Sequence, residues 1–598
     1  MKGKGLLIAL IAVAFAVLLV AAVAAFTNSG ADISEDSESE SSRANVTVAH
    51  KEDINDRHIR DNQFLYEGDD PFGVVTMYLT VSYGNATDGT NHTWEEINKY
   101  STYYYEDLGI ERYKVAGLLQ VGDENGPTSG SLGYGRTIPN ATVQIRGQTS
   151  SLNPQKNYKI KILDGNGDWN GQKTIALNKH MTDGLRFRNK LSFDLMSEIP
   201  EITSLRTQFV HLYVRDTTGD NPDEFVDYGL YTQIEQLNQT ALRAHGFDKN
   251  AHLYKINFFE FLQYDAIRTV DDPEYDEKEF NAYLESKGNS DHSKLIRMID
   301  AVNDYSIPSD ELLEKYFDTE NIAYWMAFTM LVGNSDVQSR NMYIYSPLNS
   351  ETWYILPWDF DGSYMDLENE MVKHSDFKDW QKGISNYWGN VLFKRALMSE
   401  NFREELDAAV TDLLENYLST EKIAALSKKY AETVKPYAYT MPDIANEPLT
   451  KDAYDEILEH LPYETWDNYD KYRLTLESPM PFFNSVPEKS GNNYVFSWGS
   501  SYDMLAGDVK YQFILARDPE FKDVIFKEDD VAIPTITKEL TLSPGQYFIH
   551  THAVNSKGNT MNCFDQYKNE YGAMFGVFCF FVDENGQCIP YEDVEGRP

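Results

Sequence analysis

Alternating apolar and polar positions mark the first half of the chain from about residue 73. Runs rich in β-branched and aromatic residues recur there: VVTMYLTVSYG, RYKVAGLLQVGD, ATVQIRG, TQFVHLYVRD and DYGLYTQIEQLN. Partial alternation of this kind is typical of strands that bury one face. Between these runs, RFRNKLSFDLMSEI places Phe187, Leu191 and Leu195 at helical spacing. We therefore expect a β-rich first half that contains a helix.

Beyond about residue 275 the apolar spacing becomes helical. Amphipathic or buried helices are predicted for KLIRMIDAVND, DELLEKYF, NIAYWMAFTMLVG, NVLFKRALMSENFREELDAAVTDLLENYL and EKIAALSKKYAETVKPYA. Two short aromatic strands, MYIYS and TWYILPW, stand among these helices and predict a β-hairpin. The expected fold class is α+β with two lobes, β-rich to about residue 270 and α-rich after it.

The pattern changes once more near Leu474. Short strands separated by turn residues follow at regular spacing: YVFSWGSS, VKYQFILARDPEF, KELTLSPGQYFIHTHAVNSKGN and AMFGVFCFFVDENG. This spacing predicts a β-sandwich over residues 473–598. The Trp498 strand and the PGQYFIHTHAVNSKGN run resemble a fibronectin type III-like module, a likeness that says nothing of function.

The N-terminal segment predicts export. Two lysines precede an uncharged run from Leu6 to Phe26, which at about 1.5 Å per residue can just span a bilayer core. The positive flank places the body of the protein outside the cytoplasm. Alanines at the end of the run also resemble a signal-peptidase site, so residues 1–27 are either a membrane anchor or a cleaved signal peptide. Residues 28–68 are expected to be an acidic, Ser-rich linker.

Composition and charge narrow the classes of function. Hydrophobic residues make up 42% of the chain and aromatics 13%, which indicates a folded protein. The formal net charge of −41 disfavours nucleic acid as a partner. The 3 cysteines, all near the C-terminus, are too few for a disulfide scaffold or a Cys-rich zinc site. The chain also lacks the P-loop, G-x-S-x-G and H-E-x-x-H motifs.

Oxygen-bearing side chains gather around the predicted hairpin. In GNSDVQSRNMYIY, Asp336 and Asn341 precede the first strand, and Asp359 follows the second strand in LPWDFDG. A hairpin brings the start of its first strand beside the end of its second, so these side chains should meet at one end. The Asp336-x-x-x-x-Asn341 spacing is that of a kinase catalytic loop, in which the Asp accepts a hydroxyl proton and the Asn binds a metal ion.

Such hard oxygen ligands suit Mg²⁺, and also Mn²⁺. The spacing alone is a short pattern that also arises by chance. The Asp359-to-Gly362 run can equally form a structural turn with an Asx cap.

Four blocks of sequence, in order, resemble the CotH (spore-coat protein H) kinase family of atypical, secreted kinases. They are VQIRGQTSSLNPQKNYKIKI, LRFRNKLSFDLMSEI, YGLYTQIEQLN with HLYK after it, and GNSDVQSRNMYIYSP with WYILPWDFDGSY. The resemblance implies a two-lobed atypical protein-kinase-like domain over residues 69–472. It also implies an exported or membrane-anchored enzyme that transfers the ATP γ-phosphate to Ser or Thr of an unidentified protein, with ATP and Mg²⁺ as cofactors.

The resemblance assigns roles around the hairpin. Asp336 looks like the catalytic Asp, and Asn341 and Asp359 look like metal ligands. Asp361 is either a further metal ligand or a supporting turn carboxylate. No His or Arg stands directly before Asp336, so an HRD-type loop is absent. The Arg188–Asn189 pair of the second block receives no catalytic role and could fix its helix against the sheet.

The nucleotide is expected to contact the first block and two aromatic residues. Arg146 and Gly147 belong to the loop over the phosphates, where Gly147 lets the backbone approach closely. Lys156 is the first choice for neutralising the phosphates, and Lys161 is the second, ahead of Lys159. Each of the three could instead be an ordinary exposed lysine. Tyr231 and Trp353 are expected to stack on adenine, although each could be a core aromatic.

Two other functions remain open from the sequence. A cell-surface adhesion or scaffold protein could be built on the same CotH-like fold, with the sandwich as a spacer. A carbohydrate-active enzyme could use Asp359 and Asp361 as an acid pair. Stabilisation by ATP with Mg²⁺ separates a kinase from an adhesin.

Overall fold

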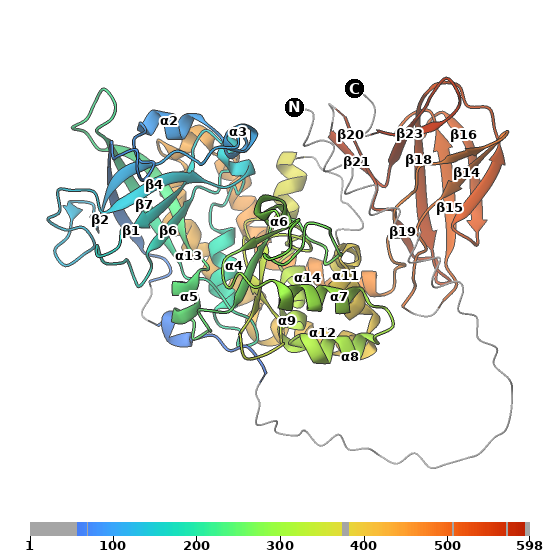
Figure 1. Ribbon diagram of the computed structural model, residues 1–598, viewed down its shortest axis with the longest axis horizontal. Coiled ribbons are helices and arrows are strands. Elements are labelled where there is room, and N and C mark those ends of the chain that lie inside the picture. The colour runs from blue at the N-terminus through green and yellow to red at the C-terminus, as the bar shows by residue number, and fades with distance from the viewer. Residues whose placement is uncertain (1–56, 68–69, 374–381, 505–506, 570–571, 592–598) are drawn as a thin grey trace, which may run out of the picture. The chain divides into compact units, whose positions relative to one another are not determined.

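A computed structural model describes residues 57–67, 70–373, 382–504, 507–569 and 572–591 (Figure 1). The described residues form two compact units, a larger one from 57–373 and 389–469 and a smaller one from 382–388 and 470–591. Within these residues, no helix combines the length and apolar character needed to cross a membrane. The predicted segment Leu6–Phe26 and most of the predicted linker lie outside them.

An eight-stranded sheet forms the N-terminal part of the larger unit, in the order β1-β7-β8-β6-β5-β4-β2-β3. Its strands are β1 (Val74–Ser82), β2 (Val115–Asp123), β3 (Gly126–Pro127), β4 (Ala141–Arg146), β5 (Asn157–Ile162), β6 (Thr174–Asn178), β7 (Thr207–Asp216) and β8 (Val226–Glu235). Because β1 also pairs with β2, the sheet closes on itself. The predicted strands of the first half are therefore confirmed.

The two faces of this sheet differ in what they contact. On one face Val143, Ile160 and Leu212 join a core with Trp94 of α2 (Trp94–Lys99) and Tyr105 of α3 (Thr102–Leu108). The sequence patterns did not predict these two helices. Side chains alternate along a strand, so the intervening residues of β4, β5 and β6 lie on the opposite face.

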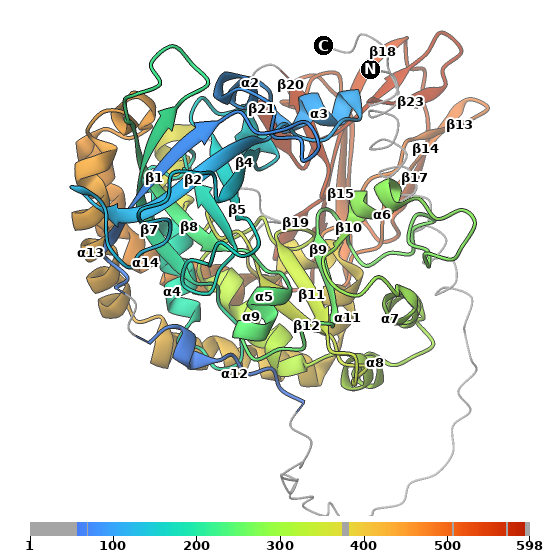
Figure 2. The ribbon, with the colours of Figure 1, turned by 60° about the vertical axis from the view of Figure 1, so that its left-hand side comes forward.

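A second, four-stranded sheet lies further along the chain, in the order β10-β9-β11-β12. Its strands are β9 (His252–Ile256), β10 (Leu284–Ser286), β11 (Met342–Ser346) and β12 (Tyr354–Pro357). Strands β11 and β12 form the predicted hairpin, and Figure 2 shows β9 beside β11. The hairpin is thus confirmed, and it is part of a larger sheet.

Helices make up most of the remaining larger unit. They are α4 (Arg188–Met196), α5 (Gln239–Ala244), α6 (Glu277–Tyr283), α7 (Ser293–Asn303), α8 (Ser309–Tyr316), α9 (Thr319–Leu331), α10 (Asp366–Glu368), α11 (Val391–Met398), α12 (Glu400–Asp412), α13 (Thr420–Ala438) and α14 (Lys451–Leu476), the last of which continues into the smaller unit. The five predicted helical runs of the second half all appear among them. Helix α9 is buried on nearly every side, as its continuous apolar sequence predicts.

The smaller unit contains several small sheets. Its strands are β13 (Glu488–Ser490), β14 (Asn493–Ser497), β15 (Lys510–Ala516), β16 (Val524–Val531), β17 (Thr535–Glu539), β18 (Gly545–Val554), β19 (Thr560–Asn562), β20 (Gln566–Asn569), β21 (Gly572–Phe575), β22 (Phe578–Val582) and β23 (Cys588–Pro590). Trp498 is buried in a core formed mainly by β14, β15, β18 and β22, where its ring stacks on Phe513 at 5.5 Å between centroids. The β-rich character predicted for this region is confirmed.

Candidate active site

The end of the β11–β12 hairpin brings Asn341 and Asp359 together. Asn341 directly precedes β11, Asp359 follows β12, and Met342 pairs with Pro357 across the hairpin. Both residues adopt a left-handed backbone with φ of 56°. Asn and Asp tolerate this conformation better than most residues, and it commonly marks functional sites. The strand pairing therefore places the backbone of Asn341 and of Asp359 at the same end of the hairpin.

Asn334 links the two sides of this end. Its Oδ1 accepts a hydrogen bond from the Asp336 backbone N–H at 3.3 Å, and its Nδ2 donates to the Asp359 carbonyl at 3.3 Å. Asn341 Nδ2 donates to the Asp336 carboxylate at 3.0 Å. Asp336, Asn341 and Asp359 thus belong to one hydrogen-bonded group. Asn334 has no role in the sequence analysis, although it lies in the GNSD run that singles out Asp336.

The Asp336 carboxylate is half-exposed and pairs with Arg340. Arg340 Nη2 lies 2.7 Å from Asp336 Oδ1, and the two side chains are 51% and 52% exposed. Partial burial raises the pKa of Asp336, Arg340 opposes this shift, and the charge of Asp361 adds to it. Asp336 can therefore meet a second molecule at the surface while remaining within the electrostatic reach of Asp361.

Asp359 and Asp361 form a pair of like charges. Burial and then the charge of Asp361 raise the pKa of Asp359 to about 7, against the opposing effect of His180, Arg146 and Lys255. His180 is almost fully buried, and its Nδ1 lies 3.8 Å from Asp361 Oδ2. A cation bound beside these carboxylates would favour the ionised form of Asp359.

Cations from both sheets meet beside this acid pair. The Arg146 guanidinium, at the end of β4, and the Lys255 ammonium, on β9, each lie 5.7 Å from the centre of the Trp358 ring. Arg146 Nη1 also donates to Asn178 Oδ1 at the end of β6. Because Trp358 directly precedes Asp359, these two cations flank the segment that carries the acids. Lys255 is the lysine of HLYK in the third block, to which sequence reasoning gave no role.

Further cations gather around Glu285 of β10. Glu285 pairs with Lys255 across the β10–β9 ladder and forms an ion pair with Lys287. Burial alone would raise the pKa of Glu285. The pKa nevertheless lies below its usual range, because Lys287, Lys255 and Lys159 stabilise the charged carboxylate. Arg112 is also within the electrostatic reach of Glu285. We refer to Arg112, Arg146, Lys159, Lys255 and Lys287 as the basic cluster. In a chain with a net charge of −41, such a cluster favours an anionic ligand.

The choice among Lys156, just before β5, and the two lysines of β5 needs correction. Lys156 is 9% exposed, and its Nζ donates to the Ser151 carbonyl at 2.7 Å within its own loop. Lys161 is exposed and pairs with Thr142 of β4. Lys159 pairs with Gln144, which is two residues nearer to Arg146 along β4. Lys159 shares a face with Arg146 and lies within the electrostatic reach of both Arg146 and Glu285. The preference for Lys156 and Lys161 is therefore not supported by their placement.

Gly147 is required by its own turn. Its φ is 90°, and a Cβ there would lie 2.0 Å from Ser150 Oγ. Its carbonyl accepts a hydrogen bond from Thr102 Oγ1 at 2.6 Å. The glycine therefore allows the loop after β4 to close on Ser150, whereas the expectation was that it admits a ligand.

Tyr231 and Trp353 are not brought together. Tyr231 is 2% exposed in the core of the eight-stranded sheet, with Lys179 Nζ 4.3 Å from its ring. Trp353 is 1% exposed and packs on His252 and Tyr254, which lie on the face of β9 opposite Lys255. It also stands at the end of the hairpin remote from Asp359. The expected adenine clamp is thus wrong for this pair, because both rings are core aromatics.

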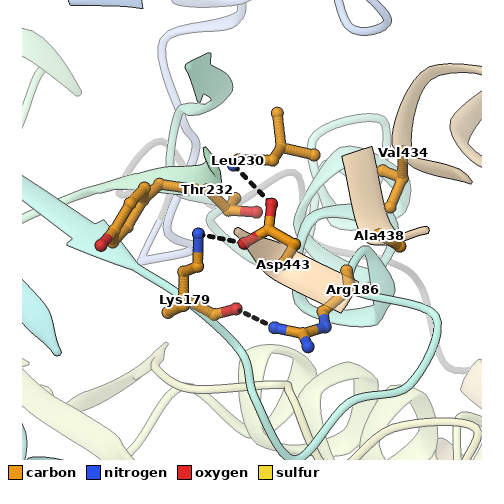
Figure 3. Close-up of a pocket in the computed structure, with 8 residues that line it drawn as sticks. Lys179, Arg186, Leu230, Thr232, Val434, Ala438 and Asp443 are labelled. Atoms are coloured by element: carbon orange, nitrogen blue, oxygen red, sulfur yellow. Dashed lines mark hydrogen bonds and ion pairs between the residues drawn. The ribbon is translucent and has the colours of Figure 1, made fainter. Parts of the chain in front are cut away.

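A small pocket lined by residues of β8 and α13 has its charges paired internally (Figure 3). Lys179 Nζ lies 2.5 Å from Asp443 Oδ1, and Asp443 Oδ2 accepts from the Leu230 N–H at 2.8 Å. Burial lowers the pKa of Lys179 to about 8, against the effect of Asp443. Arg186 Nη1 donates to the Lys179 carbonyl at 3.0 Å. Because these polar groups are paired with one another, we interpret the pocket as a structural contact next to His180.

The donors at the hairpin end fit a divalent cation of the Mg²⁺ type. Asp359 and Asp361 supply carboxylate oxygens, and the hydrogen bonds that Asn341 makes within the described residues leave from Nδ2, so its amide oxygen is available. Mg²⁺ and Mn²⁺ take such hard oxygen ligands. Burial, and then the charge of Asp361, raise the pKa of Asp359, and a cation bound to both carboxylates would favour its ionised form.

The part of the chain that contains this site is similar to known proteins. A protein-family model described as CotH kinase protein matches residues 143–465. Inner spore coat protein H from Bacillus subtilis (strain 168) is 20% identical over 292 residues, which are 48% of this chain and 75% of that protein. The family match contains the hairpin end, the acid pair and every member of the basic cluster except Arg112.

Proposed function

Since the chain belongs to the CotH kinase protein family, we propose that it is an atypical protein kinase that transfers the ATP γ-phosphate to Ser or Thr of an exported protein. The observation that carries the proposal is the meeting of the basic cluster with the Asp359–Asp361 pair beside Asp336. A nucleotide triphosphate needs cations along its phosphates and a metal-binding acid at the reacting end. The grouping of these cations and acids in a chain with a net charge of −41 supports both roles.

The placement of the side chains supports a binding role for each. Arg146, Lys255 and Lys159 would pair with phosphate oxygens in charge-assisted hydrogen bonds. Asp359 and Asp361, with the amide oxygen of Asn341, would hold Mg²⁺. The bound ion would neutralise charge on the phosphates. This assignment replaces Lys156 and Lys161 by Lys159 and Lys255 as the cationic partners.

Asp336 would act on the acceptor. Its half-exposed carboxylate would orient the Ser or Thr hydroxyl and take its proton as the hydroxyl oxygen bonds to the γ-phosphorus. The bond from that phosphorus to the bridging oxygen breaks, and ADP leaves with the electron pair. The ion pair between Asp336 and Arg340 must open before Asp336 can take the hydroxyl proton. The raised pKa of Asp336 favours its acceptance of that proton.

The wider organisation is part of the same proposal. The eight-stranded sheet and the helical region would be the two lobes of a kinase-like domain, with ATP at the basic cluster. The N-terminal residues would export the enzyme, either as a membrane anchor or as a cleaved signal. The β-rich smaller unit would be an accessory, fibronectin type III-like module.

Transfer of labelled phosphate from ATP to a Ser-rich acceptor tests the proposal in the full chain. Asp336→Asn should retain ATP binding and lose transfer by about 10²- to 10⁴-fold, the range of general-base effects. Glu351→Gln is the matched control, because Glu351 is an exposed carboxylate in the turn of the same hairpin, remote from Asp359. Full transfer by Asp336→Asn would contradict its role, and absence of transfer by the unmodified chain would contradict the kinase assignment.

A further inference from the structure

Helix α4 buries polar side chains that need partners. Arg188, Asn189 and Ser192 are each 0% exposed. Buried polar groups destabilise a fold unless they are hydrogen-bonded, so the partners of these residues indicate what the helix holds in place. The Ser192 hydroxyl donates only to the Arg188 carbonyl within its own helix, at 2.9 Å. The partners of Arg188 and Asn189 lie elsewhere in the chain.

Asn189 contacts two neighbouring groups, the side-chain carboxylate of Asp359 and the backbone N–H of Phe360. Its Nδ2 donates to Asp359 Oδ1 at 3.3 Å, and its Oδ1 accepts from the Phe360 backbone N–H at 3.1 Å. One amide group therefore fixes the carboxylate and the main chain next to it. Rotation of the Asp359 carboxylate away from its present direction would break the first of these bonds.

The backbone at Asp359 needs such support. Its left-handed φ of 56° is sparsely populated for residues other than Gly and persists when neighbouring contacts over-determine it. Phe360 is 0% exposed, and its ring packs edge-on against Phe193 of α4 and Phe328 of α9, each at 5.8 Å between centroids. Helix α4 thus holds this turn through both a hydrogen-bonding and an apolar contact.

Arg188 fixes the segment that follows. Its Nε donates to the Tyr364 carbonyl at 2.7 Å, and its Nη1 lies 2.6 Å from Glu368 Oε2 and 2.5 Å from Asp183 Oδ1. Asp183 Oδ2 also accepts from the Arg188 backbone N–H at 3.0 Å, which caps the start of α4. The N-terminal turn of α4 is therefore joined to both ends of the segment from Asp359 to Glu368.

We propose that Asn189 is a positioning residue that directs the Asp359 carboxylate toward a divalent cation, with Arg188 holding the downstream arm of the same turn. The inference rests on the proposed function, because Asp359 is a cation ligand only there. Residues that orient a ligating carboxylate through a hydrogen bond typically change metal affinity by about 10- to 100-fold when removed. The Arg188–Asn189 pair thereby receives a role that the sequence alone does not provide.

The test compares Asn189→Ala with Ser192→Ala in the full chain. Both variants shorten a fully buried polar side chain of α4, but only Asn189 contacts the Asp359 turn. Calorimetric titration with Mn²⁺ alone should show about 10- to 100-fold weaker binding for Asn189→Ala and unchanged binding for Ser192→Ala. Equal Mn²⁺ affinity in Asn189→Ala and the unmodified chain would overturn the inference. Asn189→Ser, which keeps one polar atom in the buried site, should show a smaller loss and replaces Asn189→Ala if that variant fails to fold.

Hydrogen exchange separates this inference from the proposed function. The Phe360 amide should exchange faster in Asn189→Ala and at the unmodified rate in Ser192→Ala, because only the first variant removes its acceptor. This result is expected with or without metal. An unmodified chain that binds neither Mn²⁺ nor ATP would refute the proposed function, and with it the direction of Asp359 toward a cation. Unchanged exchange at Phe360 in Asn189→Ala would refute the positioning role alone.

Discussion

Asp359→Asn should stabilise the metal-free fold at pH 8. The side chains are nearly isosteric, and an Asn189 bond to the new amide oxygen can persist. The folded-state pKa of Asp359 is raised from 3.8 to about 7. Between these values the folded state binds more protons than the unfolded state, so stability falls as the pH rises. A shift of about 3 units at 1.36 kcal/mol each gives an upper bound of about 4 kcal/mol, and solvent screening of this partly exposed group reduces it to about 1–2 kcal/mol.

Urea unfolding in the presence of a chelator, followed at pH 3.5 and pH 8, measures this effect. The free energy of unfolding of Asp359→Asn should match that of the unmodified chain at pH 3.5 and exceed it at pH 8. Added Mg²⁺ should stabilise only the unmodified chain, by mass action on the folded state. If the DFDG run is a purely structural turn, Asp359→Asn should instead lose stability at pH 8, and that result would refute the reasoning.

Further predictions concern single side chains. Lys255→Met should weaken ATP binding by about 10- to 100-fold, the range for loss of a charge-assisted hydrogen bond, while Lys161→Met should leave the calorimetric affinity unchanged. Trp353→Phe should also leave ATP affinity unchanged, because Trp353 packs on the face of β9 opposite Lys255; a tenfold loss would restore the adenine clamp. His245, buried between Asp61 and Glu235, has its pKa raised to about 9 by hydrogen bonds to these carboxylates against the cost of burial. Its ion pairs should contribute about 3 kcal/mol below pH 6.5 and lose it as the pH rises to about 9, so His245→Gln should flatten the unfolding free energy measured across that range.

The sequence predicts those parts of the site that depend on local pattern. Strands β11 and β12 are short aromatic runs close together in the chain, so the approach of Asn341 to Asp359 follows from hairpin geometry alone. Asp336 lies five residues before Asn341 in the same segment. Local spacing therefore suffices to bring these residues near one end of the hairpin, but it does not assign their roles.

The cationic partners depend on contacts between distant segments. Lys255 reaches the site because β9 pairs with β11, some ninety residues later in the chain, and no local pattern encodes that pairing. Lys156 and Lys159 differ in strand register and in a bond to Ser151, which residue type does not reveal. Tyr231 and Trp353 illustrate the same limit, since an aromatic residue suits a core and a ligand site equally well.

Calorimetric titration of the full chain with ATP, in the presence and absence of Mg²⁺, tests the central claim most directly. The basic cluster and the acid pair predict binding that strengthens markedly with Mg²⁺, and an Asp359→Asn variant in which this Mg²⁺ dependence is lost. Glu351→Gln, at the far end of the hairpin, should bind as the unmodified chain does. Failure of the unmodified chain to bind ATP with Mg²⁺, or equal Mg²⁺-dependent binding by Asp359→Asn, would contradict the account.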